Sequence, residues 1–195
     1  EDYADNLRLL DDLLNKINLA THKRTDFERT KTIVTSDHGE MLGDYGMLYK
    51  STFLEPAIRV PMFIFCPNEE EAGKTIKRPV TSTDIIKKNI KYLTTKENSR
   101  NSNTGKVVIE FGEERCFIHD NLKLVTNQNN KYLWSTRICK DGREIKIGKQ
   151  SSEWKNNRRK WEGLINWATK QNNKLNEEKN RLANCLDKEE NNKPK

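Results

Sequence analysis

The chain has 195 residues, with 36 Lys and Arg against 29 Asp and Glu, and a formal net charge of +7. This length allows one medium domain, or one small domain with a piece of another. The mean hydropathy of −0.97 is low for a self-contained core of this size. The longest apolar run, residues 60–66, is interrupted by Pro61 and is far too short to cross a bilayer, so no membrane span is expected.

The excess of basic residues does not indicate a nucleic-acid partner. Lysines are spread thinly along the chain, and no Arg-rich run is interleaved with aromatic side chains that could stack on bases. The four cysteines, Cys66, Cys116, Cys139 and Cys185, have no zinc-site spacing and are too few for a disulfide scaffold. We expect ordinary thiols, and a single disulfide stays open for an exported protein. The first residue is Glu1, so we expect a fragment whose parent's compartment is unknown.

The first half of the sequence has the element order of an α/β unit. Residues 3–19 carry apolar side chains at steps of three and four, which predicts an amphipathic helix. Residues 32–36 form a short β-branched run that is typical of a buried strand. Residues 60–65 predict a second apolar strand, and residues 85–93 predict a helix, whereas residues 41–57 are expected to be irregular.

The pattern changes after a polar stretch at residues 94–105, which we interpret as a linker. Strands are predicted at 106–111, 114–118, 122–125 and 132–138, and their tight connections favour an antiparallel sheet. A helix is predicted from residue 153 to about residue 186. The expected organisation is therefore an α/β part at 1–93, the linker at 94–105, a small α+β subdomain at 106–186, and a disordered tail at 187–195.

The residues with chemical potential follow the first predicted strand. Asp37 and His38 come directly after it, and ligands of open α/β sheets bind beyond the carboxyl ends of the strands. A carboxylate and an imidazole at one turn can serve one cation, and Gly39 allows a close backbone approach. Lys50 adds a positive charge a short loop away. A metal ion and a lysine converging on one pocket suit the oxygens of a tetrahedral oxyanion ester.

The spaced string TIVTSDHGEMLGDYGMLYKSTFLEPAIRVPMFIFCP, residues 32–67, resembles a segment of the type I sulfatases of the alkaline phosphatase superfamily, which include arylsulfatase-like and choline-sulfatase-like enzymes. The family pattern is a buried strand, Ser-Asp-His/Asn-Gly, Leu-Gly-Asp/Glu-x-Gly, a lysine, and an Arg-Val-Pro strand. The resemblance implies part of an alkaline-phosphatase-like mixed sheet sandwiched by helices, followed by a small C-terminal antiparallel sheet with a helix. Beyond residue 80 the resemblance is one of kind only.

Carried over residue by residue, the resemblance implies that Asp37 and His38 are metal ligands and that Lys50 contacts the sulfate as a catalytic and substrate-binding residue. Calcium is implied by the family. His38 leaves manganese or magnesium open, since calcium prefers oxygen ligands. Glu55 and Arg59 are expected to hold the loop and strand together, with an ion pair between them as one arrangement. The family often has His where this chain has Tyr45.

The resemblance also implies parts that this sequence does not contain. The motif Cys-x-Pro/Ala-x-Arg, whose first residue becomes formylglycine, is not found; Cys139-Lys140-Asp141-Gly142-Arg143 has Asp141 in the Pro/Ala position and lies after the metal segment. We therefore expect an inactive fragment of a sulfuric ester hydrolase that needs an N-terminal half to act on a sulfated small molecule or glycan. The alternatives are a phosphoryl or phosphonate ester hydrolase of the same superfamily, and a noncatalytic truncated or interaction module.

Overall fold

The structure is a computed structural model that describes residues 2–65, 67, 73–87 and 105–191, with side chains described as far as residue 184. The chain forms two compact units, residues 1–37 with 60–76 and residues 38–59 with 77–195. Residues 38–59 thus group with the C-terminal part of the chain. The predicted linker at 94–105 lies almost entirely outside the described residues, so the predicted domain boundaries stay a prediction.

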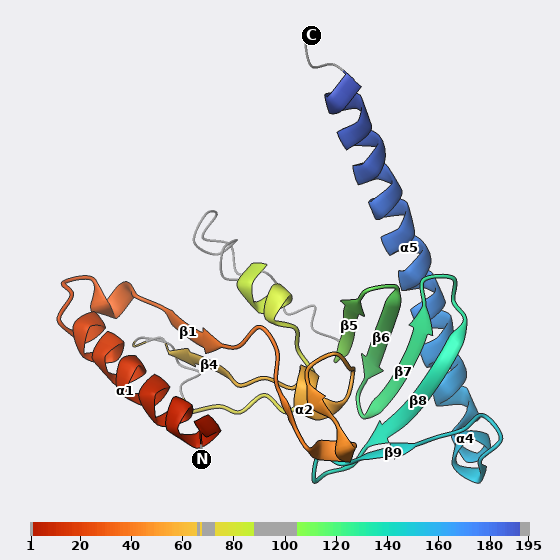
Figure 1. The fold of residues 1–195 in the computed structure, drawn as a ribbon, viewed down its shortest axis with the longest axis horizontal. Coiled ribbons are helices and arrows are strands. Elements are labelled where there is room, and N and C mark those ends of the chain that lie inside the picture. The colour runs from red at the N-terminus through yellow and green to blue at the C-terminus, as the bar shows by residue number, and fades with distance from the viewer. Residues whose placement is uncertain (1, 66, 68–72, 88–104, 192–195) are drawn as a thin grey trace. The chain divides into compact units, whose positions relative to one another are not determined.

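The first unit contains one long helix and a two-stranded sheet (Figure 1). Helix α1 (Asp2–His22) has the predicted amphipathic pattern but no buried residue. Strands β1 (Thr32–Thr35) and β4 (Met62–Phe65) pair antiparallel, with Val34 opposite Phe63. Strand β1 was predicted to be buried, yet it is only half-buried, and Phe63 of the apolar strand β4 is 56% exposed. The two-stranded sheet is therefore apolar in sequence but partly exposed in the structure.

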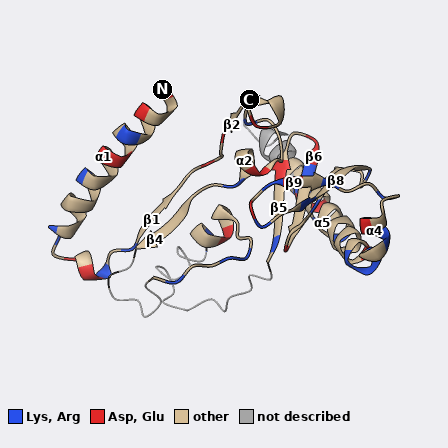
Figure 2. Cartoon of the chain, turned by 90° about the horizontal axis from the view of Figure 1, so that it is seen from below, with Lys and Arg blue, Asp and Glu red and all other residues tan. Residues whose placement is uncertain are grey.

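Helix α1 carries charges of both signs, with four aspartates, one arginine and one lysine along its length (Figure 2). Arg8 and Asp5 form an exposed ion pair at 2.7 Å, one turn apart. Exposed pairs of this kind contribute at most about 1 kcal/mol. Among the described helices of the whole chain, none is both long and apolar enough to cross a membrane.

The second unit is built on a five-stranded antiparallel meander, the sheet predicted from the sequence. Its strands are β5 (Lys106–Phe111), β6 (Glu114–His119), β7 (Leu122–Asn127), β8 (Tyr132–Ile138) and β9 (Glu144–Lys146), paired in chain order. The short strand β9 was missed in the sequence. Helix α5 (Arg158–Asn191) packs against β6 and β7, and α4 (Ser152–Asn156) precedes it (Figure 1). Helix α5 continues to Asn191, into the segment expected to be a disordered tail.

Two apolar clusters lie on the two faces of this sheet. On one face, Phe117 and Leu124 pack with Trp154, Trp161 and Leu164 of the helices. On the other, the buried residues are Phe53, Val107, Cys116, Ile118 and Val125. Phe53 comes from the segment predicted to be irregular, so this face of the sheet is covered by the sulfatase-like segment itself.

The α5 face also holds a buried cation. Arg115 of β6 is 0% exposed, and its Nε donates to Glu110 at 2.7 Å while its Nη1 donates to the side chains of Asn172 and Asn176 of α5, both at 2.8 Å. Lys179 of α5 forms a further ion pair with Glu110. Polar contacts as well as apolar packing therefore fix α5 on the sheet.

Taken together, the chain is mixed α/β with antiparallel sheets and packed helices, as the sequence predicted. The segment between β1 and β4 contains short elements: β2 (Met41–Leu42), β3 (Leu48–Tyr49), the one-turn helix α2 (Glu55–Ile58) and a 3-10 turn at Asp44–Gly46. Another 3-10 turn, Phe27–Arg29, precedes β1. Residues 82–87 are helical, and the rest of the helix predicted at 85–93 lies outside the described residues.

Candidate functional site

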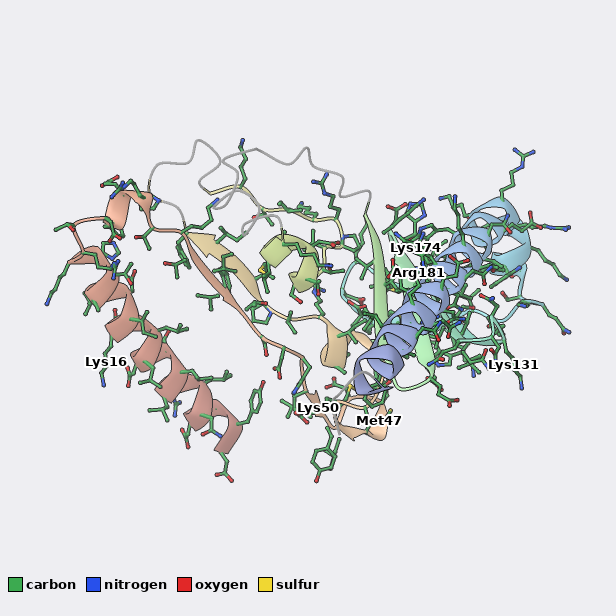
Figure 3. All side chains as sticks on the ribbon, turned by 90° about the horizontal axis from the view of Figure 1, so that it is seen from above. Lys16, Met47, Lys50, Lys131, Lys174 and Arg181 are labelled. Carbon is green, nitrogen blue, oxygen red and sulfur yellow. The ribbon has the colours of Figure 1, made fainter. Side chains whose placement is uncertain are left out.

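A short hairpin returns the chain to His38. Strands β2 and β3 pair antiparallel, with Met41 opposite Tyr49 and Leu42 opposite Leu48. Met41 is buried and anchors the hairpin, while Lys50 follows β3 directly. Figure 3 shows Lys50 and Met47 on the same loop. The hairpin thereby brings Lys50 close to His38, which lies twelve positions earlier in the chain.

Lys50 and His38 are in direct contact. The Nζ of Lys50 lies 2.7 Å from Nε2 of His38, and Nδ1 of His38 lies 2.9 Å from the carbonyl oxygen of Gly39. A carbonyl oxygen can only accept a hydrogen bond and an ammonium can only donate one. With the Lys50 ammonium as the donor, Nε2 of His38 is the acceptor, and the ring proton lies on Nδ1, which donates to the Gly39 carbonyl oxygen.

Gly39 is required by a close backbone approach rather than by an unusual φ. Its N–H donates to the carbonyl oxygen of Ala57 at 2.7 Å. A Cβ at this position would lie 2.0 Å from the carbonyl oxygen of Pro56. The turn that presents His38 is thus packed directly on α2, and only glycine has room there.

Asp37 is the last residue of the first unit, and His38 is the first residue of the second. The Asp37 side chain is exposed, and Ser36 Oγ donates to its Oδ1 at 3.3 Å. Its joint role with His38 therefore stays a prediction.

Asp37 and His38 are the candidate metal ligands of this segment. A carboxylate and an imidazole on consecutive residues are a donor set that suits a divalent cation. In the part of the chain that is described, no group of three or more His, Cys, Asp or Glu side chains is arranged to hold a metal ion. Nε2 of His38, the nitrogen with the free electron pair in this tautomer, is the atom that accepts from Lys50, so a cation there would replace the Lys50 ammonium.

The loop around Lys50 is held by residues that the sequence did not reveal. Lys123 of β7 lies 2.9 Å from Glu55 and 2.9 Å from Glu144, and it donates to the carbonyl oxygen of Phe53 at 2.7 Å. Glu55 thus pairs with Lys123, and the ion pair considered between Glu55 and Arg59 is not formed. Tyr45, where the family often has His, accepts from the backbone N–H of Glu144 at 3.0 Å.

A cavity of about 400 Å³ adjoins the residues that follow Lys50. It is bounded by the loop and by the tip of the β5–β6 hairpin, and its lining includes Ser51, Thr52, Phe53, Phe111, Gly112, Glu113, Glu114 and Trp134.

Residues 1–94, just under half of the chain, match the sulfatase family model, which supports the resemblance drawn from residues 32–67. The family is one of sulfuric ester hydrolases, and its members generally bind a divalent metal ion.

Three curated relatives are arylsulfatase K proteins. The chain is 39% identical to the mouse protein over 75 residues, 39% identical to the rat protein over 57 residues, and 32% identical to the human protein over 75 residues. These matches cover 38%, 29% and 38% of the chain. They span only 13%, 10% and 14% of the three relatives.

Proposed function

We propose that the chain supplies one part of a sulfate-ester hydrolysis site, with Lys50 as the residue that binds the sulfate group. The observation that carries this is the contact of Lys50 with His38 within a sulfatase-family segment. A lysine ammonium neutralises charge on the sulfate oxygens, and it does so more strongly as charge builds up in the transition state.

Asp37 and His38 are the residues that would hold the metal ion, by the Asp37 carboxylate and Nε2 of His38. Calcium is the ion that the family resemblance favours, and the imidazole leaves manganese or magnesium open. When bound, the ion would act as a Lewis acid toward the sulfate oxygens. The substrate would be a sulfated small molecule or glycan.

The chain alone is proposed to be inactive. The Cys-x-Pro/Ala-x-Arg motif is not in its sequence, and two ligands bind a divalent cation weakly. A complete site would need the N-terminal half of a sulfatase catalytic domain, either in a longer parent chain or in a partner chain. That half would contribute the formylglycine nucleophile and further ligands, as the resemblance implies.

The test is Lys50→Ala in a parent that contains the whole catalytic domain, assayed on a chromogenic aryl sulfate. We expect kcat/KM to fall by about 10²–10³-fold, the usual cost of one charge-stabilising donor. Lys131→Ala is the control, because Lys131 is an exposed lysine on the β7–β8 turn of the same unit. Wild-type turnover of the Lys50→Ala enzyme would refute the role proposed for Lys50.

The metal assignment has its own test. Calcium or manganese is titrated into the wild-type parent and into a parent with Asp37→Asn and His38→Ala, and the melting temperature is followed. A ligand that binds only the folded state raises its stability, so the wild type should gain and the double variant should gain less. If neither ion changed the stability of the parent or of this chain, the metal site would be refuted.

A further inference from the structure

Lys123 is a buried cation on the face of the sheet that carries the sulfatase-like loop. Its side chain is 0% exposed, as against 13% for Glu55 and 1% for Glu144. A buried charge is tolerated only where it is paired and hydrogen-bonded. Lys123 meets this condition with two carboxylates and one carbonyl oxygen, so its position is fixed by the loop that it holds.

Glu144 of β9 is the common partner of the cluster. Its Oε1 accepts from Lys123 at 2.9 Å and from the backbone N–H of Glu55 at 2.7 Å, and its Oε2 accepts from Thr136 at 2.5 Å. Its own backbone N–H donates to the hydroxyl of Tyr45 at 3.0 Å. Thr136 and Lys123 of the sheet therefore fix the Glu144 carboxylate, and this carboxylate binds the backbone of the Lys50 loop at Glu55.

The contacts flank Lys50 on both sides in sequence. Tyr45 lies before it, and Phe53 and Glu55 lie after it. Phe53 also inserts its ring into the apolar cluster on this face of the sheet, where it is 2% exposed. The ends of the Lys50 loop are thus attached to one rigid element, which limits where its ammonium can be.

We propose that Lys123 and Glu144 are positioning residues that hold the loop carrying Lys50 in place beside His38, so that the C-terminal sheet is a working part of the sulfate site. The proposal rests on the function proposed for Lys50. The two residues act through the loop and not by contact with the ester. Catalytic groups need placement within about 0.5 Å, and supporting polar contacts are a usual means of achieving it.

The first readout is the His38 ring in the full chain, which has three histidines. Long-range ¹H–¹⁵N spectra distinguish the two neutral tautomers, and the wild type should show the proton on Nδ1. Glu144→Gln and Tyr45→Phe should shift His38 toward a mixture of tautomers, since Lys50 would no longer be held at Nε2. Arg137→Met is the control, because it removes a different ion pair of the sheet, with Glu153 at 2.5 Å.

The second readout is trypsin cleavage after Lys50. Release of the loop should accelerate this cleavage by about tenfold or more in Lys123→Met, relative to cleavage after Arg24 in the first unit, because cleavage follows local opening. Should Lys123→Met fail to fold, Tyr45→Phe decides, since it removes a single hydrogen bond. An unchanged His38 tautomer and unchanged cleavage in the loop variants, or equal changes in Arg137→Met, would overturn the proposal.

The two proposals fail in different ways. If Lys50→Ala abolishes turnover in the parent while Glu144→Gln leaves His38 and Lys50 unchanged, the positioning role is wrong and the function stands. If Glu144→Gln releases Lys50 but Lys50→Ala has wild-type turnover, the sulfate-binding role of Lys50 is wrong. Lys123 and Glu144 would then hold the loop without serving catalysis.

Discussion

The carboxylate of Glu55 lies 2.9 Å from the ammonium of Lys123, a residue of the C-terminal sheet. Glu55 opens helix α2, and the next helix residues pack on the turn at Gly39. One ion pair thereby connects the sheet, α2 and the turn that presents His38. The sulfatase-like segment and the C-terminal subdomain share a core in this region, although the sequence resemblance fades beyond residue 80.

Glu144→Ala should destabilise the second unit by about 3–5 kcal/mol, because it leaves Lys123 short of a partner in a buried place. Urea unfolding followed by tryptophan fluorescence measures the change. The matched control is Glu178→Ala on α5, where the carboxylate is 54% exposed and lies 3.9 Å from Lys174. That substitution should cost less than about 0.5 kcal/mol. Equal effects of the two substitutions would show that the Lys123 cluster does not stabilise the fold.

Gly39→Ala should destabilise the chain by about 1–3 kcal/mol or displace the turn, since the new methyl group would collide with the Pro56 carbonyl oxygen. Gly148→Ala is the control, because nothing lies within 4 Å of the position of its Cβ. The melting temperature of each variant and the amide signals of residues 38 and 57 provide the measurement. A Gly39→Ala chain with wild-type stability and unshifted amides would contradict the close approach.

The sequence predicted the elements whose patterns are long enough to be periodic. Helix α1 and strands β5 to β8 follow from repeated apolar spacing and from turn residues between them. Strands β2 and β3 have two residues each, and β9 has three, so no alternation could reveal them. Their positions depend on what they pair with rather than on their own composition.

Some residues of the candidate site were predictable from a local motif, and others were not. Asp37, His38 and Lys50 were proposed from the spacing of a motif, and the structure brings His38 and Lys50 into contact. Lys123 gave no signal, because a lysine between Leu122 and Leu124 has the pattern of a strand with one face in water. That face is instead covered by residues 53–55, a contact between segments far apart in the chain. Only the tertiary structure shows it.

Trp161→Ala should destabilise the α5 face by about 3–5 kcal/mol. The Trp161 ring is fully buried and is stacked on Trp154, with 4.6 Å between ring centroids and 6° between planes. Trp161→Phe should cost clearly less, because the indole N–H that it removes has no hydrogen-bond partner among the described residues. Leu182→Ala, at an α5 position that is 65% exposed, is the control and should be nearly neutral. Denaturant unfolding measures the free energy of unfolding of each variant. The loss should be largest for Trp161→Ala, smaller for Trp161→Phe and smallest for Leu182→Ala, and another order would contradict the packing described for Trp161.

Cys116 predicts how stability depends on pH in the alkaline range. Burial between β5 and β7 raises the pKa of its thiol above the ordinary value, an effect that Lys123 opposes and that Glu144 and Glu55 add to. The thiol then ionises in the unfolded chain at a pH where it stays neutral in the folded chain. This contribution to stability is complete below about pH 9 and is lost as the pH rises further, by up to about 1.4 kcal/mol per pH unit. The unfolding free energy should therefore fall less between pH 7.5 and pH 10 in Cys116→Ala than in the wild type. Parallel pH profiles for the wild type and Cys116→Ala would show that the thiol is not desolvated.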